Sequence, residues 1–156
     1  MGLDNIPKKY PCIGNEIRDS EGRIDCQKNQ ETGRCTWKNE YESELRLKEA
    51  GPTYGMLGTD CWYRGKWGNA LLDLLGESVN HNYSFYGNGF ENGDEGIAPE
   101  ECLEISEFMD EYVEEFAYIV GKKFPDQSKG YINDYIYASW WLKFIGNFGE
   151  GSQVWY

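Results

Sequence analysis

Cysteine is the residue type in this chain with the clearest capacity for chemistry. Four of the five cysteines lie in the first 68 residues with 13, 8 and 25 positions between them, and they are Cys12, Cys26, Cys35 and Cys61. Four thiolates can bind one zinc ion tetrahedrally. Structural zinc sites usually contain closely spaced cysteine pairs, which are missing here, so two disulfides or buried free thiols are the alternatives. We expect a structural zinc centre at these four positions.

A thiol- or metal-dependent hydrolase is the enzymatic alternative for the same region. It would use Asp60, Cys61 and His81, which would have to meet in a cleft. His81 is the single histidine and lies in an alternating segment, 79–86, which predicts a hydrogen-bonded residue in a half-buried strand. The sequence contains no serine nucleophile motif and no phosphate-binding loop. We therefore assign no catalytic residue and expect a protein that is not an enzyme.

A segment rich in glycine and aromatic residues, 51–69, leads into an apolar helical pattern at 66–76 and overlaps its first residues. So many glycines predict a loop whose backbone packs closely against aromatic rings. One interpretation of this loop is a structural corner of the core. The alternative is a small-ligand or nucleotide site that uses Trp62, Arg64 and Trp67 together with glycine amide groups.

The segment 99–121 predicts a long amphipathic helix. Its apolar stripe repeats at steps of three and four residues and consists of Cys102, Ile105, Met109, Tyr112, Phe116 and Ile119, widened by Leu103, Phe108, Val113 and Val120. The other side carries eight acids: Glu100, Glu101, Glu104, Glu107, Asp110, Glu111, Glu114 and Glu115. Acids four positions apart repel each other by roughly 0.2–0.5 kcal/mol. They either solvate the helix or form a docking surface for a basic partner, at Glu100, Glu104, Glu107, Glu111 and Glu114.

The periodicities of the sequence outline the scaffold that positions these residues. Helices are predicted over 39–50, 66–76, 99–121 and 130–147, and the last of them is apolar and aromatic on nearly every side. Short strands are predicted around 15–25, 53–57, 79–86 and 152–156, with residues 1–12 extended against the body. We expect a single α+β domain over 1–156, in which short antiparallel strands pack against the acidic helix and the aromatic helix.

The charges are distributed unevenly along the chain. The net charge is −12, and residues 1–68 contain eleven basic and eleven acidic residues, whereas residues 69–156 contain four and sixteen. Such an excess of acids repels nucleic acid and anionic membranes, so basic proteins, cations or neutral ligands are the expected partners. No apolar run reaches the ~20 residues of a membrane span, and the first residues lack the apolar stretch of a signal peptide. A cytoplasmic protein is therefore expected.

Two motifs together resemble a group of proteins. GLDNIP-x-x-YPC at 2–12 and GTDCWYRGKWGN at 58–69 are similar to small uncharacterised proteins of bacteriophage genomes, and the similarity covers most of the chain. No activity is attached to that group, so the resemblance implies no catalytic residues. It implies a phage setting in the host-cell cytoplasm, where small acidic proteins often act as accessory factors or inhibitors of host defence. Together with the acidic helix, it predicts a non-enzymatic protein that binds a basic host or phage protein.

Overall fold

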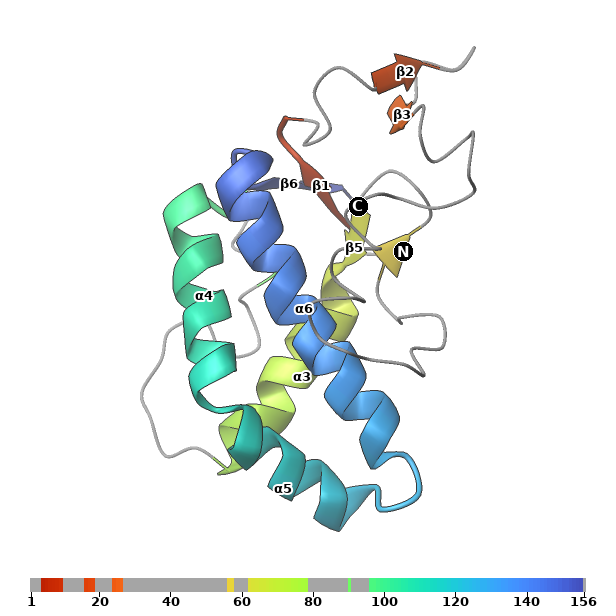
Figure 1. Ribbon diagram of the computed structural model, residues 1–156, viewed down its shortest axis with the longest axis vertical. Coiled ribbons are helices and arrows are strands. Elements are labelled where there is room, and N and C mark those ends of the chain that lie inside the picture. The colour runs from red at the N-terminus through yellow and green to blue at the C-terminus, as the bar shows by residue number, and fades with distance from the viewer. Residues whose placement is uncertain are drawn as a thin grey trace.

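The computed structural model describes residues 4–9, 16–18, 24–26, 56–57, 62–78, 90 and 96–155. Over these residues the chain is α+β, as predicted, with short strands beside a group of packed helices (Figure 1). The strands are β1 (Asp4–Pro7), β2 (Glu16–Arg18), β3 (Ile24–Cys26), β4 (Met56–Leu57), β5 (Trp62–Arg64) and β6 (Ser152–Trp155). The helices are α3 (Gly65–Ser78), α4 (Pro99–Glu111), α5 (Val113–Lys123) and α6 (Ser128–Phe148).

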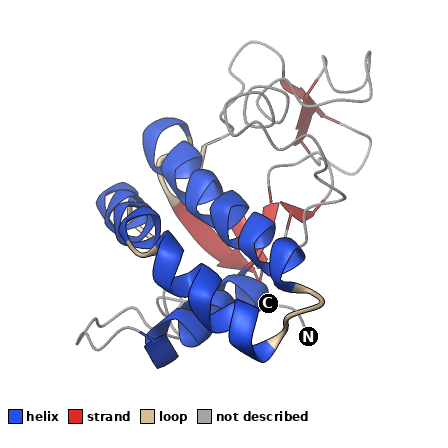
Figure 2. Cartoon of the chain, turned by 60° about the horizontal axis from the view of Figure 1, so that its bottom comes forward, coloured by secondary structure: helices blue, strands red, loops and turns tan. Residues whose placement is uncertain are grey.

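A four-stranded antiparallel sheet joins the two halves of the chain. Its order is β4-β5-β1-β6, so β1 from the start of the sequence lies between β5 and β6. Asn5 in β1 is opposite Tyr63 on one side and Val154 on the other. Ile97 extends the sheet edge through a bridge to Ser152. The charge-neutral half and the acidic half therefore contribute to one sheet, with α6 crossing in front of it in the view of Figure 2.

Most strand predictions on the described residues are confirmed. β2 and β3 pair antiparallel as a hairpin, β4 lies within 53–57, and β6 lies within 152–156. Within the segment 51–69, β4 and the start of α3 fall where a strand and a helix were predicted, whereas β5 forms a strand at 62–64 where a loop was expected. Side chains alternate between the two faces of a strand, so Tyr63 is buried while its neighbour Arg64 is exposed. The predicted helix 39–50 and strand 79–86 lie outside the described residues.

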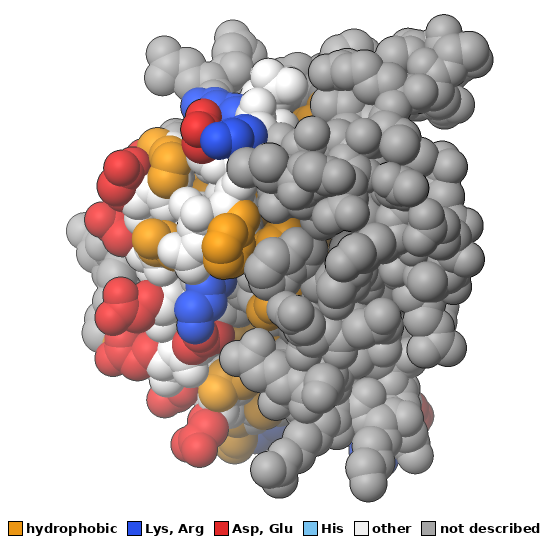
Figure 3. Space-filling model, turned by 45° about the horizontal axis from the view of Figure 1, so that its top comes forward, with side chains coloured by type: hydrophobic (Ala, Val, Ile, Leu, Met, Phe, Trp, Pro, Cys, Tyr) orange, Lys and Arg blue, Asp and Glu red, His pale blue; other side chains and the backbone are white. Residues whose placement is uncertain are grey.

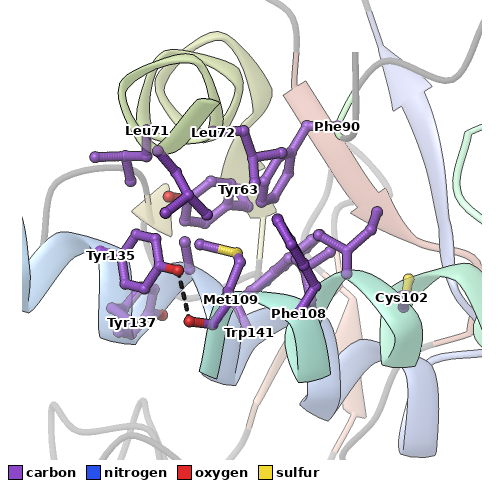
Figure 4. Close-up of a cluster of buried hydrophobic side chains, with 14 of the residues drawn as sticks. Tyr63, Leu71, Leu72, Phe90, Cys102, Phe108, Met109, Tyr135, Tyr137 and Trp141 are labelled. Carbon is purple, nitrogen blue, oxygen red and sulfur yellow. Dashed lines mark hydrogen bonds between the residues drawn. The ribbon is translucent and has the colours of Figure 1, made fainter. Parts of the chain in front are cut away.

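Tyr63 connects the sheet to the helices at the centre of the core. Its side chain is fully buried, and its ring centroid lies 5.0 Å from that of Phe90 and 5.1 Å from that of Trp141 on α6. Leu71 and Leu72 of α3 belong to the same buried cluster (Figure 4). Aromatic pairs at such separations contribute roughly 0.5–1.5 kcal/mol each beyond the burial of their area. The core is therefore organised around aromatic rings, as the aromatic share of 16% predicts.

Small residues allow α4 and α6 to pack closely. Ser106 of α4 is buried and donates to the carbonyl oxygen of Ser139 on α6 at 2.8 Å. The Ser139 hydroxyl lies 2.5 Å from Asp110 Oδ1 and donates to it. A Cβ atom on Gly146 would lie 3.0 Å from the carbonyl oxygen of Pro99, so a larger residue there would push the helices apart. These contacts place the start of α4 beside the end of α6, and the two helices are antiparallel.

The predicted helix 99–121 is in fact two helices, α4 and α5, which meet at Tyr112. Tyr112 has φ −105° and ψ 23°, and α5 turns away from the direction of α4 (Figure 1). Just before this break, the carbonyl oxygen of Met109 accepts a hydrogen bond of 2.5 Å from the Tyr135 hydroxyl of α6 (Figure 4). A side chain that enters the carbonyl ladder of a helix is a known cause of kinks. The acids predicted on one helix therefore lie on two helices with different directions.

The apolar stripe of this segment faces the core with one exception. Leu103, predicted to widen the stripe, is 37% exposed. Ser106 is buried, although it is polar and was not assigned to the stripe. Its burial is possible because Ser139 satisfies its hydrogen bonds. The contact between α4 and α6 thus decides which side of α4 is inside.

Candidate functional site

The carboxylates of α4 and α5 face solvent. All eight are exposed, and we call them together the acidic face: Glu100, Glu101, Glu104, Glu107, Asp110, Glu111, Glu114 and Glu115. Acidic side chains line the edge of the molecule on the side of α4 (Figure 3). The structure therefore places the five residues predicted to bind a partner on the outer sides of two consecutive helices.

Part of the acidic face is explained by the fold. Glu100 and Glu101 lie in the first turn of α4, and Glu114 and Glu115 lie in the first turn of α5. A negative charge at a helix N-terminus is favourable by about 0.3–1 kcal/mol, because it opposes the positive end of the helix dipole. Asp110 accepts the hydrogen bond from Ser139. These acids each have a role in their own helix or in its contact with α6.

Glu104, Glu107 and Glu111 have no such role. Their spacing of three and four positions places them along one side of α4, where neighbouring acids repel each other by a few tenths of a kcal/mol, roughly. Glu111 ends α4, and a negative charge at a helix C-terminus is unfavourable. In the part of the chain that the structure describes, no ion pair involves any of the three. The fold tolerates these charges at a small cost.

An open groove between α3 and α5 continues the acidic face at one end. Its volume is about 400 Å³, and it is lined by Glu77 of α3 and by Glu114, Glu115, Tyr118, Ile119 and Lys122 of α5. An ion pair between Lys123 and Glu77 ties the end of α5 to α3. Tyr118 is 61% exposed, and Lys122 Nζ lies 4.6 Å from the centre of its ring. The groove combines an exposed aromatic ring with carboxylates from two helices.

This groove was not predicted from the sequence. Glu77 and Glu114 come together only because α3 packs on α5, which no local pattern encodes. One signal was present, however. Tyr118 is a large aromatic residue that falls outside the apolar stripe of its helix, so the periodicity places it on the solvent side, next to the acids.

The predicted zinc site lies largely outside the described residues. Cys26 ends β3 opposite Glu16, whereas Cys12, Cys35 and Cys61 fall in segments that the structure does not describe. Over the described ranges, no group of three or more His, Cys, Asp or Glu side chains is arranged to hold a metal ion. Zinc at Cys12, Cys26, Cys35 and Cys61 stays a prediction.

Cys102, the remaining cysteine, is fully buried on α4. Burial raises the pKa of its thiol from 9.0 to about 12, and the negative charge of Glu101 adds to this shift. The thiolate is the form that attacks substrates and binds metals. Cys102 is therefore a core residue rather than a reactive one.

The predicted ligand-binding residues lie on two elements. Trp62 and Arg64 are in β5, and Trp67 is in α3. Trp67 is partly buried, and its ring centroid lies 5.6 Å from that of Tyr131 on α6. This contact makes Trp67 part of the packing between helices, and the ligand site stays a hypothesis. The residues of the hydrolase alternative lie outside the described part of the chain: Asp60, Cys61 and His81.

Comparison of the chain with protein-family models, with curated proteins and with solved structures gives no match. Among the described helices, none has the length and apolar character needed to cross a membrane. The acidic face and its groove are thus the surface features from which a function can be inferred.

Proposed function

We propose that this protein is a non-enzymatic binding protein that docks a basic protein on its acidic face. The line of Glu104, Glu107 and Glu111 carries the proposal, because these exposed like charges repel one another without a role in the fold. A basic surface placed against α4 would attract these three carboxylates and offset their mutual repulsion. The acids would then lower the free energy of the complex, although they slightly raise that of the free protein.

The charge of the whole chain supports the same class of partner. A net charge of −12 produces a field that attracts basic proteins and increases their rate of association. Exposed charges are screened beyond about 10 Å at 0.1 M salt, so the association should depend strongly on salt. Nucleic acids, which are polyanions, would be repelled.

The resemblance of residues 2–12 and 58–69 to phage proteins supports a setting for this binding. In that setting the protein is an accessory factor or an inhibitor of host defence in the host cytoplasm. The partner is a basic protein of the host or of the phage. The long acidic helix expected from the sequence is then the docking element, divided between α4 and α5.

Charge reversal with a matched control tests the proposal. The variant Glu107→Lys with Glu111→Lys replaces two exposed acids of the acidic face, and Asp73→Lys with Asp126→Lys replaces two exposed acids elsewhere. Both double variants change the net charge equally. Immobilised wild-type protein and the control should capture basic proteins from a bacterial extract and release them as salt rises from about 0.05 to 0.3 M. The Glu107 and Glu111 variant should lose them.

Mass spectrometry of the released fractions identifies the captured proteins. Circular dichroism checks that both variants keep their helices. A folded Glu107 and Glu111 variant that captures the same proteins as the wild type would show that the acids only solvate α4 and α5. Equal loss in both variants would show that net charge matters and that the position of the charges does not.

A further inference from the structure

The groove between α3 and α5 differs from the rest of the acidic face, because it adds an aromatic ring and a concave shape to the carboxylates. Tyr118 is the most exposed large hydrophobic residue among those described, at 61%. Glu114 and Glu115 lie one turn before it on α5, and Ile119 extends the apolar part of the groove. A straight exposed line of acids has none of these features.

A cation already lies on the Tyr118 ring. Lys122 follows Tyr118 by one helical turn, and its ammonium group lies 4.6 Å from the ring centre. The electron-rich face of an aromatic ring attracts cations by about 0.5–1 kcal/mol at exposed sites. Lys122 thus shows that this ring face can hold a positively charged group.

The guanidinium group of arginine fits this groove better than an ammonium group. It is planar, so it can stack on a ring while its N–H groups form paired hydrogen bonds with a carboxylate. The ammonium group of lysine is compact and strongly hydrated, so it neither stacks flat on a ring nor forms the paired hydrogen bonds. Glu77 is already paired with Lys123, which leaves Glu114 and Glu115 as the carboxylates for an incoming cation.

We infer that the groove is an arginine-binding subsite of the acidic face. An arginine side chain of the basic partner stacks on Tyr118, pairs with Glu114 or Glu115, and displaces Lys122 from the ring. This inference rests on the proposed function and narrows it. The partner presents at least one arginine. The groove gives the acidic face a preference for arginine over lysine, which charge alone does not provide.

Two peptides of equal charge, nona-arginine and nona-lysine, test the inference in calorimetric titrations of the full chain. The wild type should bind nona-arginine about two- to fivefold more tightly than nona-lysine. Tyr118→Leu removes the ring and keeps an apolar side chain, so the ratio of the two peptide affinities should fall to about one. Tyr118→Phe keeps the ring and should keep the preference. Glu104→Gln with Glu107→Gln, away from the groove, should weaken both peptides alike.

The outcomes distinguish failure of the arginine subsite from failure of the proposed function. Equal affinity for the two peptides, or a preference that survives Tyr118→Leu, overturns the arginine subsite. The proposed function still stands in that case if both peptides bind more weakly at about 0.2 M than at 0.02 M salt and more weakly to the Glu104 and Glu107 variant. No binding of either peptide at low salt overturns the proposed function, and the arginine subsite with it.

Discussion

Glu101 and Cys102 are neighbours in α4 with opposite surroundings. Glu101 is exposed in the first turn, whereas Cys102 is fully buried. Burial is the largest cause of the raised pKa of the Cys102 thiol, at about 12, and the adjacent carboxylate acts in the same direction. At the scale of single residues, an acid that is favourable at the helix N-terminus also adds to the rise in the pKa of the neighbouring thiol, which is caused mainly by burial.

Cys102 should therefore resist alkylation in the folded protein. Iodoacetamide at pH 8 should leave it unmodified for as long as the protein is folded and should label it rapidly in denaturant, as peptide mapping would show. The raised pKa also makes stability depend on pH. The contribution of this thiol is complete below its unfolded pKa of 9.0 and decreases as pH rises from there toward 12. Labelling of Cys102 in native protein at the rate of a free thiol would contradict its burial.

At the scale of elements, α6 determines the shape of the segment that carries the acids. Tyr135 donates to the Met109 carbonyl oxygen just before α4 ends, and Ser139 contacts Ser106 and Asp110. These bonds hold the inner side of α4 against α6 and lie next to the point where α4 ends. The acidic face consequently follows the bend at Tyr112, beside these contacts with α6.

Tyr135→Phe should destabilise the fold by roughly 1–3 kcal/mol, because it leaves the buried Met109 carbonyl without its hydroxyl donor. Tyr118→Phe removes an exposed hydroxyl and should change the free energy of unfolding by less than about 0.5 kcal/mol. Urea unfolding followed by tryptophan fluorescence measures both. Equal stability of the two variants would mean that the Tyr135 hydroxyl does not hold the junction of α4 and α5.

Sequence patterns predicted the presence of the helices better than the point at which one helix ends and the next begins. The aromatic helix was predicted over 130–147 and spans 128–148, since its length and apolar character are local properties. The break at Tyr112 lies beside a contact with Tyr135, a residue of another helix, and periodicity within 99–121 contains no information on such a contact. The same limit applies to the site. The acids were predicted from one helical pattern, whereas the groove requires the packing of α3 on α5.

At the scale of the whole molecule, the predicted zinc centre concerns the charge-neutral half. The described strands of that half are two to four residues long. A metal that binds the folded chain but not the unfolded one stabilises the fold, so zinc at the four predicted cysteines would add stability to this half. Cys26, at the end of β3, is the predicted ligand whose strand is described.

We expect purified protein to contain about one equivalent of zinc and to lose thermal stability when a chelator is added. Cys26→Ser should lose the metal, and Cys102→Ala, in the core of the helices, should keep it. Metal-free protein in which each disulfide has removed two of the five reactive thiols would support the disulfide alternative. Metal-free protein with all five thiols free in denaturant would support buried cysteines, and either result would end the zinc prediction.

The pairing of β1 with β6 has a consequence for how the chain folds. Ser152 Oγ donates to Asn5 Oδ1 at 3.0 Å across a sequence separation of 147 positions, whereas the contact of Ser106 with Ser139 spans 33. Closing a long loop costs more entropy than closing a short one, so the helices can pack before β6 joins the sheet. During synthesis, β1 can pair with β5 early, whereas its other edge stays unpaired until β6 has been made. A nascent chain ending before residue 152 would expose its acidic face on packed helices while one edge of β1 still lacked its partner.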